Sequence, residues 1–187
     1  MRYSYLLLFF LFACKENIYN PMPYGYLRLD LPEATYQMYD TVQKPYRFAF
    51  SSSAKIIDKP SKKAVLQDIY YPNFQASVYL TYHKVENEAE LEKLTEHAYK
   101  LVYDHASQAK SIVQEPIDVP AHKVYGILYL LKGSVASYMQ FYVTDSNKNF
   151  MRGALYFNAH TQWDSLQPVV KFLEKDTKKM LETLEWR

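Results

Sequence analysis

The most continuous apolar pattern in the chain lies in its second half. It falls into three segments, 124–131, 135–144 and 150–157. The first segment is apolar at both alternating sets of positions, a pattern typical of a strand covered on both faces. A turn around Gly133 and a polar cluster at 145–149 separate the segments. The pattern therefore predicts an antiparallel meander of three strands, with Leu128 fully buried in the first. Gly153 is expected to mark a bulge or a close backbone approach.

Shorter patterns on either side of the meander predict the other elements. Alternating residues indicate strands at 46–50, 64–71, 75–83 and 111–119. Apolar residues at helical spacing predict one helix from the N-cap Asn87 to about Ala109, and a second from Asp164 or Ser165 to Trp186. The predicted order is three strands, a helix, a short strand, three strands and a helix.

This order predicts an α+β domain, a mostly antiparallel β-sheet with two amphipathic helices. The topology resembles the PsbP-like α/β/α sandwich. We expect a single α+β domain over 45–187, preceded by a tether and leader over 14–44 that prolines break up. Within the leader, residues 24–31 alternate and could add an edge strand.

The N-terminus has the pattern of a lipoprotein signal peptide over residues 1–13. A short basic start precedes the apolar run 3–12, which is too short to span a bilayer. The run ends at Leu11-Phe12-Ala13-Cys14, which resembles a bacterial lipobox. The Cys14 thiol would then carry acyl chains such as palmitate, and two or more chains hold a protein on a membrane stably. Lys15 after the cysteine favours an outer-membrane lipoprotein that faces the periplasm.

Length and composition limit the partners and bonds that the chain can have. The 187 residues suit one domain, and 22 basic against 20 acidic residues give a net charge of +2, so we expect no nucleic-acid partner. Cys14 is the single cysteine, so no intramolecular disulfide can form. The 19 tyrosines indicate a tyrosine-rich sheet, part of whose aromatic surface could bind a partner.

We find no catalytic or metal-binding motif and expect neither an enzyme nor a cofactor. Ser52-Ser53-Ala54-Lys55 fits the S-x-x-K pattern of penicillin-binding proteins, but the partner motifs of that site are missing. The histidines at 83, 97, 105, 122 and 160 are scattered. His97 and His105 lie two helical turns apart, too far to share a metal ion, so metal binding is not expected.

A set of segments resembles the gliding-motility lipoprotein GldD family of the Bacteroidota. In the first half they are Pro23-Tyr24-Gly25-Tyr26, Arg28 to Pro32, and Tyr71-Pro72-Asn73-Phe74 with Ala76; in the second they are Val124-Tyr125-Gly126, Val135-Ala136-Ser137, Gln140-Phe141, Thr144-Asp145-Ser146, Phe150-Met151-Arg152-Gly153, Leu155-Tyr156-Phe157, and Asp164-Ser165-Leu166 with Pro168-Val169. The resemblance implies an envelope lipoprotein needed for gliding, with machinery tied to type IX secretion. It supplies no catalytic residues.

Two classes of function follow. The first is a non-enzymatic accessory or assembly lipoprotein that contacts other gliding or secretion proteins of the envelope. The second is a periplasmic binding module for a small molecule, glycan or lipid, for which we expect an apolar pocket lined by Tyr70, Tyr79, Tyr129 and Tyr138.

For the first class, the predicted contact residues are Pro72, Asn73, Phe74 and Arg152. Phe74 stands in a turn that Pro72 stiffens, and Arg152 interrupts an apolar strand pattern. Against this, Phe74 could pack on its own core and Arg152 could pair with an acid.

Overall fold

The computed structural model describes residues 31–104, 109–158 and 163–187. Its strands are β1 (Tyr36–Tyr39), β2 (Tyr46–Ser51), β3 (Lys55–Lys59), β4 (Val65–Tyr71), β5 (Ala76–Lys84), β6 (Ala109–Val119), β7 (Val124–Gly133), β8 (Met139–Thr144), β9 (Asn149–Phe157) and β10 (Glu185–Trp186). Its α-helices are α1 (Glu88–Asp104) and α2 (Trp163–Glu182), and two short 3-10 helices are η1 (Pro72–Phe74) and η2 (Pro120–His122).

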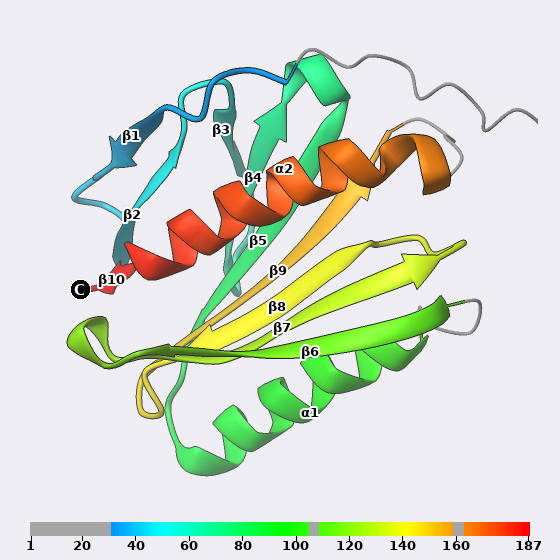
Figure 1. Ribbon diagram of the computed structural model, residues 1–187. Coiled ribbons are helices and arrows are strands. Elements are labelled where there is room, and N and C mark those ends of the chain that lie inside the picture. The colour runs from blue at the N-terminus through cyan, green and yellow to red at the C-terminus, as the bar shows by residue number, and fades with distance from the viewer. Residues whose placement is uncertain (1–30, 105–108, 159–162) are drawn as a thin grey trace, which may run out of the picture.

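A seven-stranded antiparallel sheet forms the centre of the molecule (Figure 1). Its strand order is β3-β4-β5-β9-β8-β7-β6, and every neighbouring pair is antiparallel. The meander of β7, β8 and β9 is confirmed. Residues 135–138 precede β8, which is therefore shorter than predicted, and Gly133 takes a φ of 111° in the turn before it.

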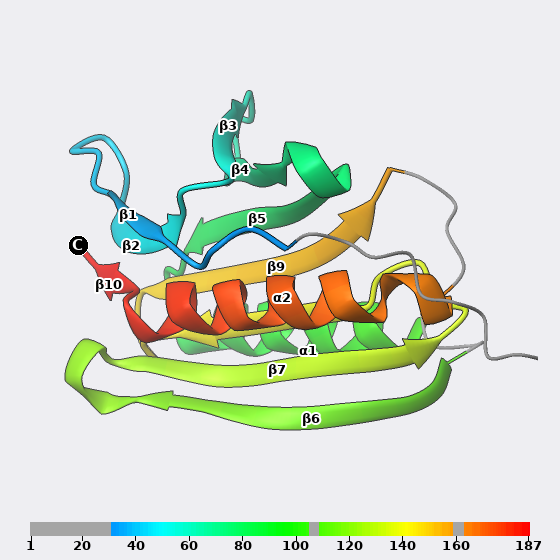
Figure 2. The ribbon, with the colours of Figure 1, turned by 45° about the horizontal axis from the view of Figure 1, so that its top comes forward.

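The two helices cover opposite faces of this sheet (Figure 2). The alternation of β7 shows the two layers most clearly. Val124 and Leu128 belong to the large core that includes Leu173 and Leu181 of α2, whereas Tyr129 packs with Val102 of α1. The prediction of a strand apolar on both faces is confirmed, and Leu128 is 1% exposed. The α+β class, with one helix on each side of a mostly antiparallel sheet, is confirmed as well.

A small second sheet, β1-β2-β10, shares the α2 face (Figures 1 and 2). The strand at 46–50 was predicted, but its place in a separate sheet was not. Trp186 lies in β10 and not at the end of a helix. The strand β1 lies in the segment assigned to the leader, so the folded part of the chain begins before Pro45. The possible edge strand at 24–31 lies largely outside the described residues.

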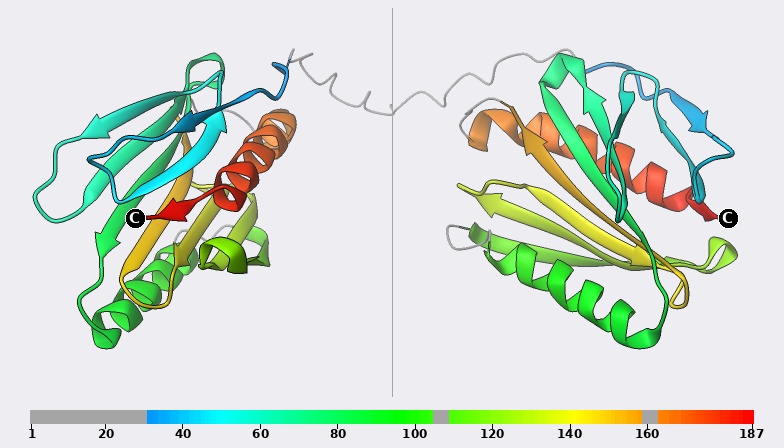
Figure 3. Two further views of the ribbon diagram at one scale, coloured as in Figure 1. Left: turned by 90° about the vertical axis from the view of Figure 1, so that its left-hand side faces the viewer. Right: turned by 180° about the vertical axis from the view of Figure 1, so that it is seen from behind.

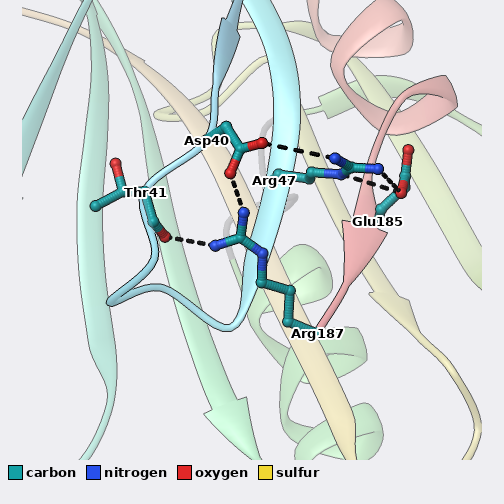
Figure 4. A network of polar contacts seen from close by, with 5 residues as sticks. All are labelled: Asp40, Thr41, Arg47, Glu185 and Arg187. Carbon is teal, nitrogen blue, oxygen red and sulfur yellow. Dashed lines mark hydrogen bonds and ion pairs between the residues drawn. The ribbon is translucent and has the colours of Figure 1, made fainter.

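Charged residues link the C-terminal residues of the chain to β2 and to the turn after β1 (Figure 4). Arg47 donates from Nε and Nη2 to Glu185 Oε2, at 3.0 and 2.5 Å. The Arg187 guanidinium binds Asp40 and donates to the Thr41 carbonyl oxygen at 2.7 Å. We call these contacts the terminal clamp, because they fasten the last residues of the chain to β2 and to the turn after β1.

The first helix begins where the sequence predicts. Asn87 Oδ1 accepts the Glu90 backbone N–H at 3.0 Å, and the Glu90 carboxylate accepts the Glu86 N–H at 2.7 Å. These bonds satisfy N–H groups that have no partner within the helix. The described part of the helix runs to Asp104, and Ala109, the predicted end of the helix, belongs to β6.

Two glycines in the meander allow close packing. A Cβ at Gly126 would collide with the carbonyl oxygen of Tyr142 on the neighbouring strand, and one at Gly153 would collide with the Phe141 ring. The close approach predicted at Gly153 is therefore confirmed, and its cause is an aromatic ring that lies across the glycine.

Candidate contact surface

The face of the sheet that carries α1 is only partly covered (Figure 3, right). The helix packs on β7, β8 and the start of β9 through residues such as Val102, Tyr142 and Phe150. On this side no described helix packs over β3, β4 or the first part of β5, whereas His83 near the end of β5 lies close to Glu90 and His97 of α1. We call this uncovered area the open face. The strand register places on it, among others, the side chains of Lys55, Ile57, Lys59, Asp68, Tyr70, Tyr79, Arg152 and Tyr156.

Tyrosines form the middle of the open face. The rings of Tyr79 and Tyr156 stack with their centroids 5.2 Å apart, and Tyr79 is 40% exposed. Tyr70 is half-buried. It lies on the same face as these rings, because Ser77 pairs with Tyr70 on one side and with Tyr156 on the other. Exposed aromatic rings on a rigid strand offer contact area at little cost in conformational entropy.

Arg152 lies on the same face of the sheet and has no acidic partner among the described residues. Its Nη2 donates to Gln140 Oε1 at 2.6 Å, and no described carboxylate lies within ion-pair distance of it. Two buried donors here, Arg152 Nε and Gln140 Nε2, have no hydrogen-bond partner in the described structure. Burial lowers the pKa of the Arg152 guanidinium, although the Tyr156 hydroxyl favours its charged form.

The remaining charges on the open face add to its positive character. Lys59 pairs with Asp68 at 3.0 Å, and Lys55 is exposed. The face thus carries three cations, Lys55, Lys59 and Arg152, against one carboxylate, Asp68. The carboxylate is already paired with Lys59.

The structure does not bring the predicted contact residues together. Phe74 is half-buried and packs edge-on against Phe172 of α2, with ring centroids 5.6 Å apart. It therefore points to the α2 side, whereas Arg152 lies on the opposite face and in the middle of β9. In the turn, Asn73 is exposed and Pro72 half-buried. A partner contact through this turn stays a prediction.

Sequence comparison settles the family. The model of the gliding motility lipoprotein GldD family matches residues 16–186. The chain belongs to this family. The family resemblance inferred from the sequence segments is thereby confirmed, and the protein is a lipoprotein of a family related to gliding motility.

Two further comparisons were made for this GldD-family protein, one with curated proteins and one with solved structures. A search of curated proteins finds no match. The solution structure of cyanobacterial PsbP (CyanoP) from Synechocystis sp. PCC 6803 is similar, with a TM-score of 0.48 and 12% sequence identity, over 84% of this chain and 96% of that chain.

The tyrosines expected to line one pocket are distributed over both sides of the sheet. Tyr70 and Tyr79 lie on the open face, and Tyr129 is buried beneath α1. Tyr138 packs with Leu166 and Val170 of α2. The four side chains therefore share no cavity in this GldD-family structure.

The described surface has two notable hollows. One, of about 1230 Å³, lies near the C-terminus and is lined by polar and charged residues with a few apolar ones. The other, of about 440 Å³, is an apolar groove between α1 and the meander, bordered by Tyr99, Tyr129 and Tyr142. Neither includes Arg152 or Tyr79.

A buried carboxylate on α2 was not identified from the sequence. Asp176 is 2% exposed, and its Oδ1 accepts the Tyr36 hydroxyl at 3.0 Å. Burial raises the pKa of this carboxyl, and the hydroxyls of Tyr36, Ser51 and Tyr71 only partly oppose the shift. Like Thr177 next to it, Asp176 is a buried polar residue in the mostly apolar stripe of α2. With these partners it ties β1 to α2, which indicates a structural role.

The other residues considered in the sequence give no site. Ser52 lies in a turn and Lys55 at the start of β3. Within residues 31–104, 109–158 and 163–187, no group of three His, Cys, Asp or Glu side chains could hold a metal ion. No helix in those ranges is long and apolar enough to cross a membrane. Cys14, His105 and His160 lie outside the described residues.

Proposed function

We propose that this GldD-family lipoprotein is a non-enzymatic accessory or assembly component of the gliding motility and type IX secretion machinery. It is held through acyl chains on Cys14, after removal of residues 1–13, on the periplasmic side of the outer membrane. It acts by contact with other envelope proteins and not by chemistry. The source organism would belong to the Bacteroidota, as the family resemblance implies.

The observation that supports this proposal is the open face. A sheet with one helix layer missing over β3, β4 and part of β5, and with exposed stacked tyrosines there, has the composition of protein interfaces. Aromatic and arginine residues commonly dominate binding energy at such interfaces. The two hollows described above include neither Tyr79 nor Arg152, so the exposed aromatic surface lies outside them.

The contact role is tested by the double variant Tyr79→Ala/Tyr156→Ala, introduced into the chromosome. We expect the variant to fold and to remain on the membrane, while secretion of type IX cargo and colony spreading decrease. Tyr99→Ala is the matched control, since Tyr99 is a 50% exposed tyrosine on α1, away from the open face. Normal secretion and spreading in the double variant would contradict the proposal.

The anchor is tested separately. Cells are labelled with an alkyne fatty acid, and the wild type is compared with Cys14→Ser. Because the thiol is the acyl acceptor, we expect labelling to be lost in the variant. Equal labelling of the two proteins would show that Cys14 carries no lipid.

A further inference from the structure

Arg152 is an unusual residue for its surroundings. A guanidinium largely removed from water is normally paired with a carboxylate, because burying an uncompensated charge is costly. Here Arg152 Nη2 donates to a neutral amide oxygen, Gln140 Oε1, at 2.6 Å. Both side chains also keep a buried donor without a partner, Arg152 Nε and Gln140 Nε2. Unsatisfied donors of this kind require an explanation in a native structure.

The described side chains around Arg152 supply no negatively charged partner, although the Tyr156 hydroxyl favours the charged guanidinium. Tyr79 and Tyr156 present ring faces and hydroxyl groups, and Tyr142, which lies opposite Arg152 on β8, packs on Phe150. The one carboxylate on the open face, Asp68, is paired with Lys59. The open face therefore carries a positive potential centred on a rigid, aromatic-flanked arginine.

We propose that the open face binds a segment of a partner protein that carries an aspartate or glutamate side chain, and that this carboxylate pairs with Arg152 beside Tyr79 and Tyr156. The inference rests on the proposed function and deepens it by giving the chemistry of the partner. A carboxylate accepts a forked pair of N–H bonds from a guanidinium, which strengthens the contact and fixes its orientation.

The shape and charge of the open face favour a partner protein over other occupants. The stacked tyrosines lie on a sheet surface and not in the hollows near α1 or the C-terminus, so a small molecule would remain largely in water. A second copy of this chain is disfavoured as well. In a twofold-symmetric pair the same surface would face itself, and the two Arg152 side chains would approach each other.

The test uses the full acylated protein in cells, with a photoreactive benzoylphenylalanine in place of Tyr79. We expect light to join it to one protein at a segment that contains Asp or Glu. The yield should fall about tenfold or more when Arg152→Gln is added, because the carboxylate then loses its charged partner. Arg152→Glu should abolish the product, and Asp or Glu→Arg at the partner position should restore it. The same photoreactive residue at Tyr99 is the control and should not give this product.

Each other outcome overturns the inference in a distinguishable way. A product at Tyr79 that is indifferent to Arg152→Gln shows a contact made without the charge pair, which leaves the proposed function standing. A product that joins two copies of this chain identifies self-association, and one with a lipid or glycan favours the binding-module function. No product at Tyr79, together with normal secretion in the Tyr79→Ala/Tyr156→Ala variant, refutes the inference and the contact role together.

Thermal unfolding separates binding from a structural role. Because Arg152 has no carboxylate to lose, Arg152→Gln should leave the melting temperature of the membrane-extracted protein unchanged or higher. A drop of more than about 5 °C, of the size expected for loss of a stabilising interaction in a domain of this size, would assign Arg152 to the fold and overturn the inference.

Discussion

Replacing Leu128 by alanine tests the central packing of the molecule. Leu128 lies in β7, between β6 and β8, and points into the core formed with α2. Its side chain is 1% exposed. The neighbouring strands are hydrogen-bonded on both sides, so the backbone has little freedom to close a cavity at this position.

The expected loss can be worked out from these facts. The change removes three carbon groups at about 0.8 kcal/mol each, or about 2.4 kcal/mol of transfer free energy. The cavity that remains adds to this, and buried Leu→Ala changes have cost about 2.7–5.0 kcal/mol. Because the site cannot collapse easily, we expect a loss in free energy of unfolding of about 3–5 kcal/mol.

Urea denaturation of residues 15–187 measures this loss. The control is Leu130→Ala, since Leu130 lies on the same face of β7, two residues further on, and is only half-buried. We expect the control to lose about half as much or less, with an unchanged m-value for both variants. A loss below about 1 kcal/mol at Leu128, or equal losses at the two positions, would refute the burial of Leu128 in the core formed with α2.

Three further changes test polar and backbone contacts. Tyr46→Phe removes a buried hydroxyl that donates to Gln67 Oε1 at 2.5 Å and should cost about 1–3 kcal/mol in chemical denaturation; a neutral result would mean that water replaces the bond. Burial raises the pKa of Asp176 above its usual 3.8, so the ionised carboxylate destabilises the folded state. The free energy of unfolding of the wild type, relative to that of Asp176→Asn, should therefore fall as the pH rises from about 4. Denaturation at a series of pH values measures this difference, which would stay constant if the pKa were unshifted. Gly126→Ala would press a methyl group against the Tyr142 carbonyl and should cost at least about 2 kcal/mol, and full stability would show that β7 and β8 can separate locally.

The sequence predicted the elements whose burial has a simple period. The strands at β2, β4, β5, β7 and β9 carry regular apolar positions, and the Asn87 cap precedes a helix with a clear stripe. The strands it did not predict are short or exposed. The strand β3, with the sequence KIIDK, is almost entirely exposed, and β10 has two residues. Such strands form because a neighbouring strand offers backbone hydrogen-bond partners, and the pattern of apolar residues in the sequence does not reveal this.

The candidate site shows the same limit. Arg152 could be singled out because it interrupts an apolar run. Tyr156 lies on the same strand as Arg152, but the place of Tyr79 beside them depends on the register of β5 with β9, which long-range packing decides. The sequence left open whether Phe74 is available in its turn or packs on the core, and it packs on Phe172 in the middle of α2.

The pairing of β5 with β9 has a consequence for how the chain folds. The paired residues are separated by 65 to 81 positions, from Lys84 with Asn149 to Ala76 with Phe157. Because the chain emerges from its N-terminal side during synthesis and export, β5 is available before the residues of β9 that pair with it. Non-local pairings of this kind fold slowly. During that interval the edge of β5 is open to strands of other chains, so aggregation of newly made protein is expected to compete with folding at this strand.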